Sequence, residues 1–255
     1  MPHLFTNLSG RAWAGPTLAA AWSLAAAASA DLHITEVWPG GLDGEENTSD
    51  WIELTNLGTT AITNLTDYHY RDSAVPGGVP NGLPLAGGQL TGVSTLLPGE
   101  SAVFLIAWEN DLGNNTNPTL SDSIAAFEAM WGVTAGVDLK LGYMLDADNE
   151  GGPGLSRNGD SVFIYDGSVT GSNVVDSVSF GVSDRASFIY NPNTDGFGQS
   201  AQAGVLGARF GLLPGSDQTT LPPIGSPGIV PEPGTAAIAT VGLLGVLTQR
   251  RRRNN

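Results

Sequence analysis

Short runs of strand-forming residues, each closed by a turn-forming cluster, constrain the fold of this chain most strongly. Residues 32–37 are rich in β-branched side chains, and residues 51–56 alternate so that Ile52 and Leu54 share one face. Residues 101–108 form a continuous apolar run whose length suits a strand buried on both faces. Turns are plentiful, since the 255 residues include 35 glycines and 16 prolines. The pattern predicts an all-β sandwich or barrel with a real core.

The rest of the chain is divided by changes in this pattern. Further strands are expected at 60–65, 67–71, 161–166 and 174–181. Between 109 and 156 the pattern predicts an insertion that packs one helix against the sandwich. Ser121 or Asp122 is expected to cap that helix, which runs to Trp131, with Ile124, Phe127 and Trp131 on one stripe and Gly132 at its end. The folded part is expected to run from 31 to 212, and residues 213–230 form a Pro/Gly-rich linker.

Charge excludes one class of partner. Residues 31–230 hold 24 acidic and five basic side chains, a net charge of −19. A surface this acidic repels phosphate backbones, so the sequence predicts no binding to nucleic acid. The same surface keeps an exported domain soluble and attracts cations.

The N-terminus has the order of a secretory signal. Arg11 supplies a positive charge, and the apolar stretch 12–27 follows it. Ala28 and Ala30 form a small-x-small cleavage pattern before Asp31. We therefore expect residues 1–30 to be a signal peptide; an Ala-rich helix of the domain is the alternative.

The C-terminus combines three elements in a fixed order. Pro231, Glu232 and Pro233 precede an apolar helix expected at 234–249, and the chain ends in the basic cluster Arg250, Arg251, Arg252 and Arg253. The helix is short for a bilayer of about 30 Å, and the arginines suit its cytoplasmic flank.

This tail, residues 231–255, resembles the PEP-CTERM sorting signal. The resemblance implies an exported protein, at least transiently anchored in the membrane by its C-terminus and recognised by an exosortase-type enzyme. It implies a location at the cell envelope or cell surface. An ordinary single-span tail anchor is the alternative, and it places the domain on the same side of the membrane.

The middle of the chain resembles the lamin-tail domain, an immunoglobulin-like β-sandwich. Four blocks carry the resemblance in order: the strand 32–37 with the W-I-E-L-T-N run at 51–56, the turn and strand at 58–65, the L-P-G turn into the apolar strand at 97–106, and the N-G-D and V-V-D strands at 158–166 and 174–181. The resemblance implies a non-catalytic domain for adhesion or protein interaction. The segments 67–96 and 109–156 depart from the family pattern.

Catalytic motifs are scarce. The chain has no cysteine and, after the signal, only His33 and His69 as histidines. It has no G-x-S-x-G elbow, no H-E-x-x-H motif and no phosphate-binding loop. We therefore expect a protein that is not an enzyme, with isolated histidines in structural or surface positions. A secreted hydrolase that uses paired carboxylates is the alternative, although no spacing singles out a pair.

One acidic loop is a candidate cation site. Asp146, Asp148 and Glu150 follow a two-residue spacing before a glycine pair, which resembles the first half of a calcium loop, and Asp160 follows in the next turn. The position of the twelfth ligand is Arg157, so a solvated acidic loop without Ca²⁺ is the alternative. A second acidic loop at 43–50 is a weaker candidate.

The sequence thus predicts an interaction or structural module of the envelope. Its expected partners are the sorting enzyme, the membrane and a surface protein or extracellular polysaccharide. Sugar binding requires aromatic side chains exposed on one face, and the candidates are Trp38, Trp108 and Trp131.

Overall fold

The protein has an all-β fold with one α-helix in the described part of the chain. The computed structural model describes residues 29–40, 50–72, 89–106, 120–145, 154–166, 173–192, 194, 196–212 and 222–229. Its elements are β1 (Leu32–Trp38), β2 (Trp51–Asn56), a 3-10 helix (Leu65–Asp67), β3 (His69–Arg71), β4 (Gln89–Thr91), β5 (Ser101–Leu105), α1 (Leu120–Trp131), β6 (Lys140–Leu145), β7 (Asp160–Tyr165), β8 (Val174–Phe180), β9 (Phe188–Asn191), β10 (Gly196–Ser200), β11 (Arg209–Phe210) and β12 (Ile224–Gly225). The all-β prediction is confirmed.

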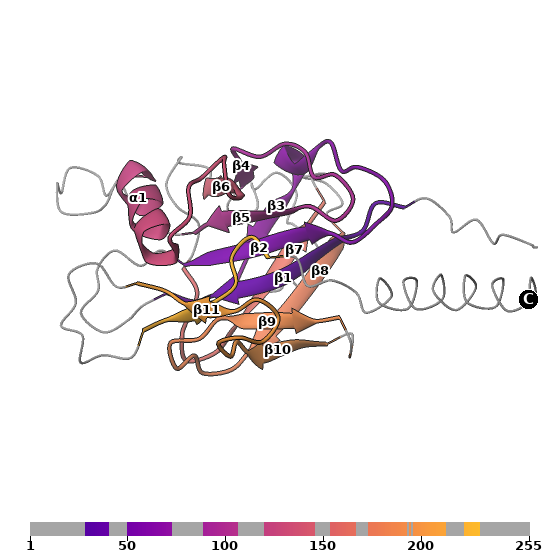
Figure 1. The fold of residues 1–255 in the computed structure, drawn as a ribbon. Coiled ribbons are helices and arrows are strands. Elements are labelled where there is room, and N and C mark those ends of the chain that lie inside the picture. The colour runs from indigo at the N-terminus through magenta and orange to yellow at the C-terminus, as the bar shows by residue number, and fades with distance from the viewer. Residues whose placement is uncertain are drawn as a thin grey trace, which may run out of the picture.

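Ten of these strands form one curved sheet in the order β10-β9-β1-β2-β5-β6-β4-β3-β7-β8, and β11 pairs with β12 separately (Figure 1). Neighbouring strands of the sheet are antiparallel, except β5 and β6, which are parallel. The far end of the sheet returns to β1, because Asp176 of β8 accepts a hydrogen bond from the backbone N–H of Ile34 at 2.7 Å. The sheet therefore encloses the apolar core between its two halves.

Strands β2 and β5 are buried on both faces. Ile52, Leu54 and Phe104 belong to the core between the sheet halves. Trp51 and Leu105 point to the opposite face, where α1 covers them. The run at 101–108 was predicted to be a strand buried on both faces. Strand β5, which covers its first five residues, confirms this.

Helix α1 packs its predicted stripe on that second face. Phe127 and Trp131 are buried and Ile124 packs beside them. Trp131 meets Trp38 edge to face at 5.6 Å between ring centroids, and Trp51 in the same way at 5.9 Å. Gly132 ends the helix with φ of 60°, and its N–H donates to the carbonyl of Glu128. The predicted helix and its end are confirmed, but the predicted cap is wrong: the helix includes Leu120, so Ser121 and Asp122 lie within its first turn.

The segment 109–156 contributes more than an inserted helix. Its strand β6 lies in the middle of the sheet, between β5 and β4. Gly142 of β6 lets the backbones approach, because a Cβ there would lie 2.5 Å from the carbonyl oxygen of Thr91. The prediction of an insertion is therefore wrong for residues 140–145, which are an integral part of the sheet.

One local prediction is wrong, and some strands lie where none was named. Residues 60–65 form no strand: Ile62 makes an isolated bridge to Leu96, and the chain then turns into the 3-10 helix. The turn-forming residues Asn64 and Asp67 favour that turn, since the Asp67 N–H donates to the Asn64 carbonyl. The Gly-rich stretch after 181 holds strands, of which β9 pairs with β1 and β10 with β9.

The linker predicted at 213–230 is wrong for residues 222–229, which we call the strap. Its residues 223, 225, 226 and 227 are buried, and it supplies β12. The N–H of Ile224 donates to the carbonyl of Arg185, and the N–H of Ser187 donates to the carbonyl of Ile224. The strap is therefore docked on the domain.

Most residues of the predicted signal peptide and all residues of the predicted sorting tail lie outside the described residues. This holds for Ala28 of the cleavage pattern, for Pro231, Glu232 and Pro233, for the helix 234–249 and for Arg250 to Arg253. Ala30 is described and exposed, and the neighbouring Ser29 hydrogen-bonds with Thr59. Among the helices that the structure describes, none has the length and apolar character needed to cross a bilayer.

Candidate functional site

A β-bulge in β1 creates the most unusual site of the domain. The register between β1 and β2 shifts between Ile34 and Glu36, so the next pair is Glu36 with Glu53. Because one extra residue enters β1, Ile34 and Val37 both reach the core, while Glu36 turns to the other face. The bulge thus sets two glutamates directly opposite each other on the face that the strap covers.

Glu36 is held by three donors, and its side chain is 1% exposed. Its Oε1 accepts hydrogen bonds from the Ser187 hydroxyl and from the Ser226 N–H, the latter at 2.7 Å. Its Oε2 accepts from the Ser226 hydroxyl at 2.7 Å. Two of the three donors belong to the strap.

Glu53 is fully buried and is also bound to the strap. Its Oε2 accepts a hydrogen bond from the N–H of Gly228 at 2.6 Å. Its Oε1 contacts the hydroxyl of Thr35 at 2.7 Å. The two glutamates together therefore clamp the strap at Ser226 and Gly228.

The strap sequence fits this clamp closely. A Cβ at Gly225 would lie 2.7 Å from Cη2 of Trp131 and 3.0 Å from Oε1 of Glu36. Gly228 has φ of 80°, a conformation that L side chains rarely adopt. The docked strap thus requires Gly225 for close packing, Ser226 for its hydrogen bonds and Gly228 for its backbone conformation.

Burial changes the proton affinity of both glutamates. Loss of hydration raises the pKa of Glu36 to about 7, although its hydrogen bonds from Ser187 and Ser226 oppose this. Loss of hydration and the charge of Glu36 raise the pKa of Glu53 to about 8. Near neutral pH the pair therefore retains a proton, as expected for two close carboxyl groups away from water.

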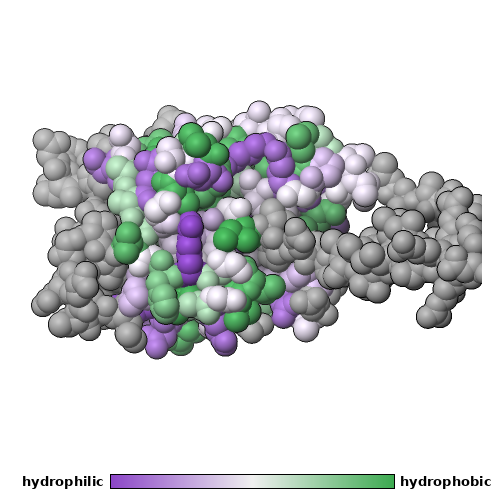
Figure 2. Space-filling view, in the orientation of Figure 1, coloured by the Kyte–Doolittle hydropathy of each residue, from purple (hydrophilic) through white to green (hydrophobic). Residues whose placement is uncertain are grey.

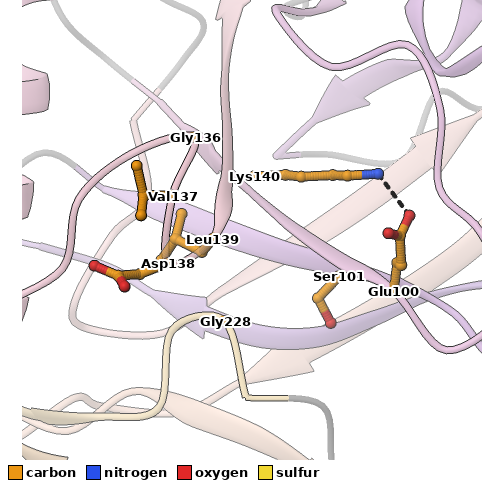
Figure 3. Close-up of a pocket in the computed structure, with 8 residues that line it drawn as sticks. All are labelled: Glu100, Ser101, Gly136, Val137, Asp138, Leu139, Lys140 and Gly228. Atoms are coloured by element: carbon orange, nitrogen blue, oxygen red, sulfur yellow. Dashed lines mark hydrogen bonds and ion pairs between the residues drawn. The ribbon is translucent and has the colours of Figure 1, made fainter.

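A chain of hydroxyl groups connects the pair to the surface. The Thr35 hydroxyl lies 2.7 Å from that of Thr55, which lies 2.6 Å from that of Ser101. Each hydroxyl can donate in either direction. Ser101 lines a pocket of about 390 Å³, and Gly228 lines the same pocket from the strap side (Figure 3).

The pocket itself holds charged side chains with partners of their own. Lys140 binds Glu100 at 2.5 Å and the Thr95 carbonyl at 2.9 Å, as the dashed line to Glu100 in Figure 3 shows. The hydrogen bond from Lys140 lowers the pKa of Glu100. Asp138 accepts a hydrogen bond from the Thr134 N–H at 2.7 Å. The acids of the pocket wall are therefore already engaged in hydrogen bonds, and Glu53 reaches the pocket through Gly228 and the hydroxyl chain that ends at Ser101.

A third acid, the half-buried Asp50, fastens another segment. Asp50 accepts a hydrogen bond from the N–H of Leu155 at 2.5 Å. Burial raises the pKa of Asp50 to about 7, and the charge of Asp160 raises it further. Asp50 thus connects the start of β2 to the turn before β7.

Of the predicted metal ligands, Asp146, Asp148 and Glu150 lie outside the described residues. Asp160 is described and fixes its own turn, since it accepts hydrogen bonds from the N–H groups of Ser156 and Ser161, each at 2.8 Å. Within the described ranges no three His, Asp or Glu side chains gather as metal ligands would. The calcium site stays a prediction.

The histidines lie apart. His33 of β1 pairs with Asp31 at 3.1 Å and with Asp176 at 3.6 Å. His69 of β3 is half-buried, and burial lowers its pKa. The structure brings neither of them to the glutamate pair.

Two of the three tryptophans proposed for sugar binding are buried. Trp38 is 1% and Trp131 is 3% exposed, so neither can stack on a sugar. Trp108 lies outside the described residues. On the face drawn in Figure 2, hydrophobic and hydrophilic residues are interspersed among those described.

The sequence interpretation missed Glu36 and Glu53 as a site. Alternation placed Glu53 opposite Ile52, a position that commonly faces water. One signal was present: Ile34, Val37 and Trp38 do not follow strict alternation, and such a break indicates a bulge. Comparison with protein-family models, with curated proteins and with solved structures found no match in any of the three.

Proposed function

We propose that this is an exported protein of the cell envelope, anchored at least transiently by its C-terminus, whose folded part is a non-catalytic interaction or structural domain. The order of the two terminal signals supports export and attachment. The order of the four sequence blocks along the chain supports a lamin-tail-like domain of the immunoglobulin-like type. In the fold these blocks lie mainly on β1, β2, β5, β7 and β8.

One observation carries the non-catalytic part of this proposal. The acids with raised pKa values, Glu36, Glu53 and Asp50, each accept hydrogen bonds from backbone N–H groups of distant segments. Catalytic carboxyl groups are expected to converge in an open pocket within reach of a substrate. Here the open pocket is lined instead by Glu100 and Asp138, which are engaged with Lys140 and a backbone N–H. The carboxyl groups serve to fasten chain segments together.

The strap connects the glutamate pair to the proposed sorting tail. It ends at Ile229, and Val230 alone separates it from the Pro-Glu-Pro motif at 231–233. The two buried glutamates therefore hold the segment that precedes the proposed sorting tail on the domain.

Cell fractionation of the full-length protein tests the proposal in a bacterium that has the sorting enzyme. The natural chain is expected in the envelope fraction and not in the cytoplasm. Replacing Pro231, Glu232 and Pro233 by alanine is expected to stop sorting, so that the chain accumulates in the inner membrane with its tail intact. Pro214→Ala, outside the motif, is the matched control and should behave like the natural chain. A cytoplasmic natural chain, or a motif variant that distributes like the control, would contradict the proposal.

A further inference from the structure

We propose that Glu36 and Glu53 form a proton-binding site that locks the strap onto the domain: the docked strap requires a proton on the pair, and loss of that proton releases it. This site goes beyond the proposed function, because it makes the docking of the segment before the tail depend on pH. The position of the two carboxyl groups, their hydrogen-bond donors and the strap that covers them support this proposal.

The pair lies where two negative charges cannot both be tolerated. Glu36 and Glu53 are directly opposite on paired strands, and neither is more than 1% exposed. Among the described residues no cationic group is hydrogen-bonded to either carboxyl group; the charge of Arg209 on β11 acts on Glu36 from a distance. Two like charges this close and away from water repel strongly, so one proton resolves the conflict.

The hydrogen bonds indicate which carboxyl group holds the proton. Glu36 accepts from three donors and is favoured by Arg209, so it is the better site for the negative charge. Glu53 accepts from the Gly228 N–H at Oε2, and its Oε1 faces the Thr35 hydroxyl. A neutral Glu53 can donate to Thr35, which then donates to Thr55, and Thr55 to Ser101. This chain accommodates the proton on Glu53 without loss of a hydrogen bond.

The same chain supplies a route for the proton. Ser101 is half-buried and lines the pocket, so the hydroxyl chain runs from the pocket to Glu53. The charged groups at the pocket are Glu100, Lys140 and Asp138, of which Lys140 is bound to Glu100. The pair can therefore exchange its proton while the strap is still docked.

The strap is the part of the structure that can respond. It covers the pair with Ser226 and Gly228, and both residues are hydrogen-bonded directly to the two carboxyl groups. The strap donors favour the charged carboxylates, but the loss of hydration on burial, to which the covering strap contributes, is the larger effect and raises both pKa values. When the last proton leaves, hydration of the two carboxylates favours the uncovered state.

Nuclear magnetic resonance of the full-length protein tests both halves of the proposal. The ¹³C signals of the glutamate side-chain carboxyl groups report the protons, and Glu36→Gln and Glu53→Gln assign the two signals. The hydrogen-exchange protection factors of the Ser226 and Gly228 amides report strap docking, with the Leu96 amide, bonded to Ile62, as the internal reference. Protection factors are corrected for the intrinsic pH dependence of exchange.

In the natural chain, two carboxyl signals should titrate near or above neutral pH. Strap protection should fall as the pH rises, by up to about tenfold per pH unit for each proton that the docked pair holds and the released pair has lost, and should level off above about pH 8. The Leu96 amide should stay protected. In Glu53→Gln, the amide can donate to Thr35 as the neutral acid does, so the part of the pH response that comes from Glu53 should disappear, and only the part from Glu36, which ends near pH 7, should remain. Glu100→Gln at the pocket rim is the matched control and should retain the natural response.

Two results would overturn the proposal, and both come from the natural chain alone. In the first, both signals titrate near the ordinary glutamate value while the strap is protected. In the second, the pair titrates near neutral pH and strap protection does not change. Neither depends on whether a variant folds or on where the protein resides in the cell.

Discussion

At the scale of single residues, the buried acids of this protein act as acceptors for its own backbone. A buried carboxylate is costly unless hydrogen bonds satisfy it. Glu36 meets this condition with Ser187 and Ser226, and Asp50 with the Leu155 N–H. Their partners are separated from them by as many as 190 positions in the chain. The acidic composition therefore serves assembly as well as solubility.

This use of acids could not be predicted from the sequence. Alternation in 51–56 correctly placed Ile52 and Leu54 in the core and Glu53 opposite them. What covers Glu53 is the strap, and its Gly-Ser-Pro-Gly composition favours a linker on local grounds. The docking depends on tertiary contacts to Trp131 and Glu36, which no local pattern contains.

Ser226→Ala tests the anchor on Glu36. The change removes the hydroxyl that donates to Oε2 and leaves a buried carboxylate without that donor, at an expected cost of about 1–3 kcal/mol in the free energy of unfolding. Urea denaturation at pH 7 measures it. Ser161→Ala is the control, because the Ser161 hydroxyl bonds Ser179 on an exposed face and should cost less than about 1 kcal/mol. Equal costs for the two variants would argue against a special role for Ser226.

At the scale of elements, strands and helices were predicted best where the spacing of apolar residues marks a buried face. Strands β1, β2, β5, β7 and β8 and helix α1 fall within a few residues of their expected ranges. The short strands β9 to β12 were not predicted, because they have two to five residues and lie in Gly-rich sequence. They form through pairing with β1 and with one another, so they depend on the partner strand more than on their own composition.

Gly225→Ala tests the fit between the strap and helix α1. The new methyl group would meet the Trp131 ring and Glu36, so we expect a loss of about 1–3 kcal/mol in stability through overpacking. Gly181→Ala is the matched control, since a Cβ there meets nothing within 4 Å and no positive φ opposes it. Thermal unfolding of both variants beside the natural chain measures the difference. A neutral Gly225→Ala would mean that the strap is not packed as described.

At the scale of the whole molecule, two glutamates lie enclosed by the curved sheet, the helix and the strap. They join the first two strands to the last described segment. The all-β class followed from the sequence, because many short strands and frequent turns allow few other solutions. The central position of β6 did not, because the order of strands in a sheet depends on long-range pairing. The predicted calcium ligands Asp146, Asp148 and Glu150 and the terminal signals lie outside the described residues, so they stay predictions.

The clamp also gives the whole protein a characteristic dependence on pH. Burial raises the pKa of Glu53 from 4.5 to about 8. Its contribution to stability is therefore fully present below pH 4.5 and is lost as the pH rises through about 8. Asp50 and Glu36 have pKa values raised to about 7 and act in the same direction. Glu100, whose pKa is lowered, contributes above the ordinary glutamate value and loses that contribution only at lower pH.

The most direct test of the clamp is the free energy of unfolding of the full-length protein from pH 5 to pH 9, measured beside Glu53→Gln and Glu100→Gln. The account predicts that Glu53→Gln is close to the natural chain at pH 5 and becomes the more stable of the two by a few kcal/mol near pH 8, a difference on the order expected for a shift of this size. Glu100→Gln should show a constant difference over the same interval. A difference between Glu53→Gln and the natural chain that does not grow with pH would contradict the account, because it would mean that Glu53 is ionised at no cost in the folded protein.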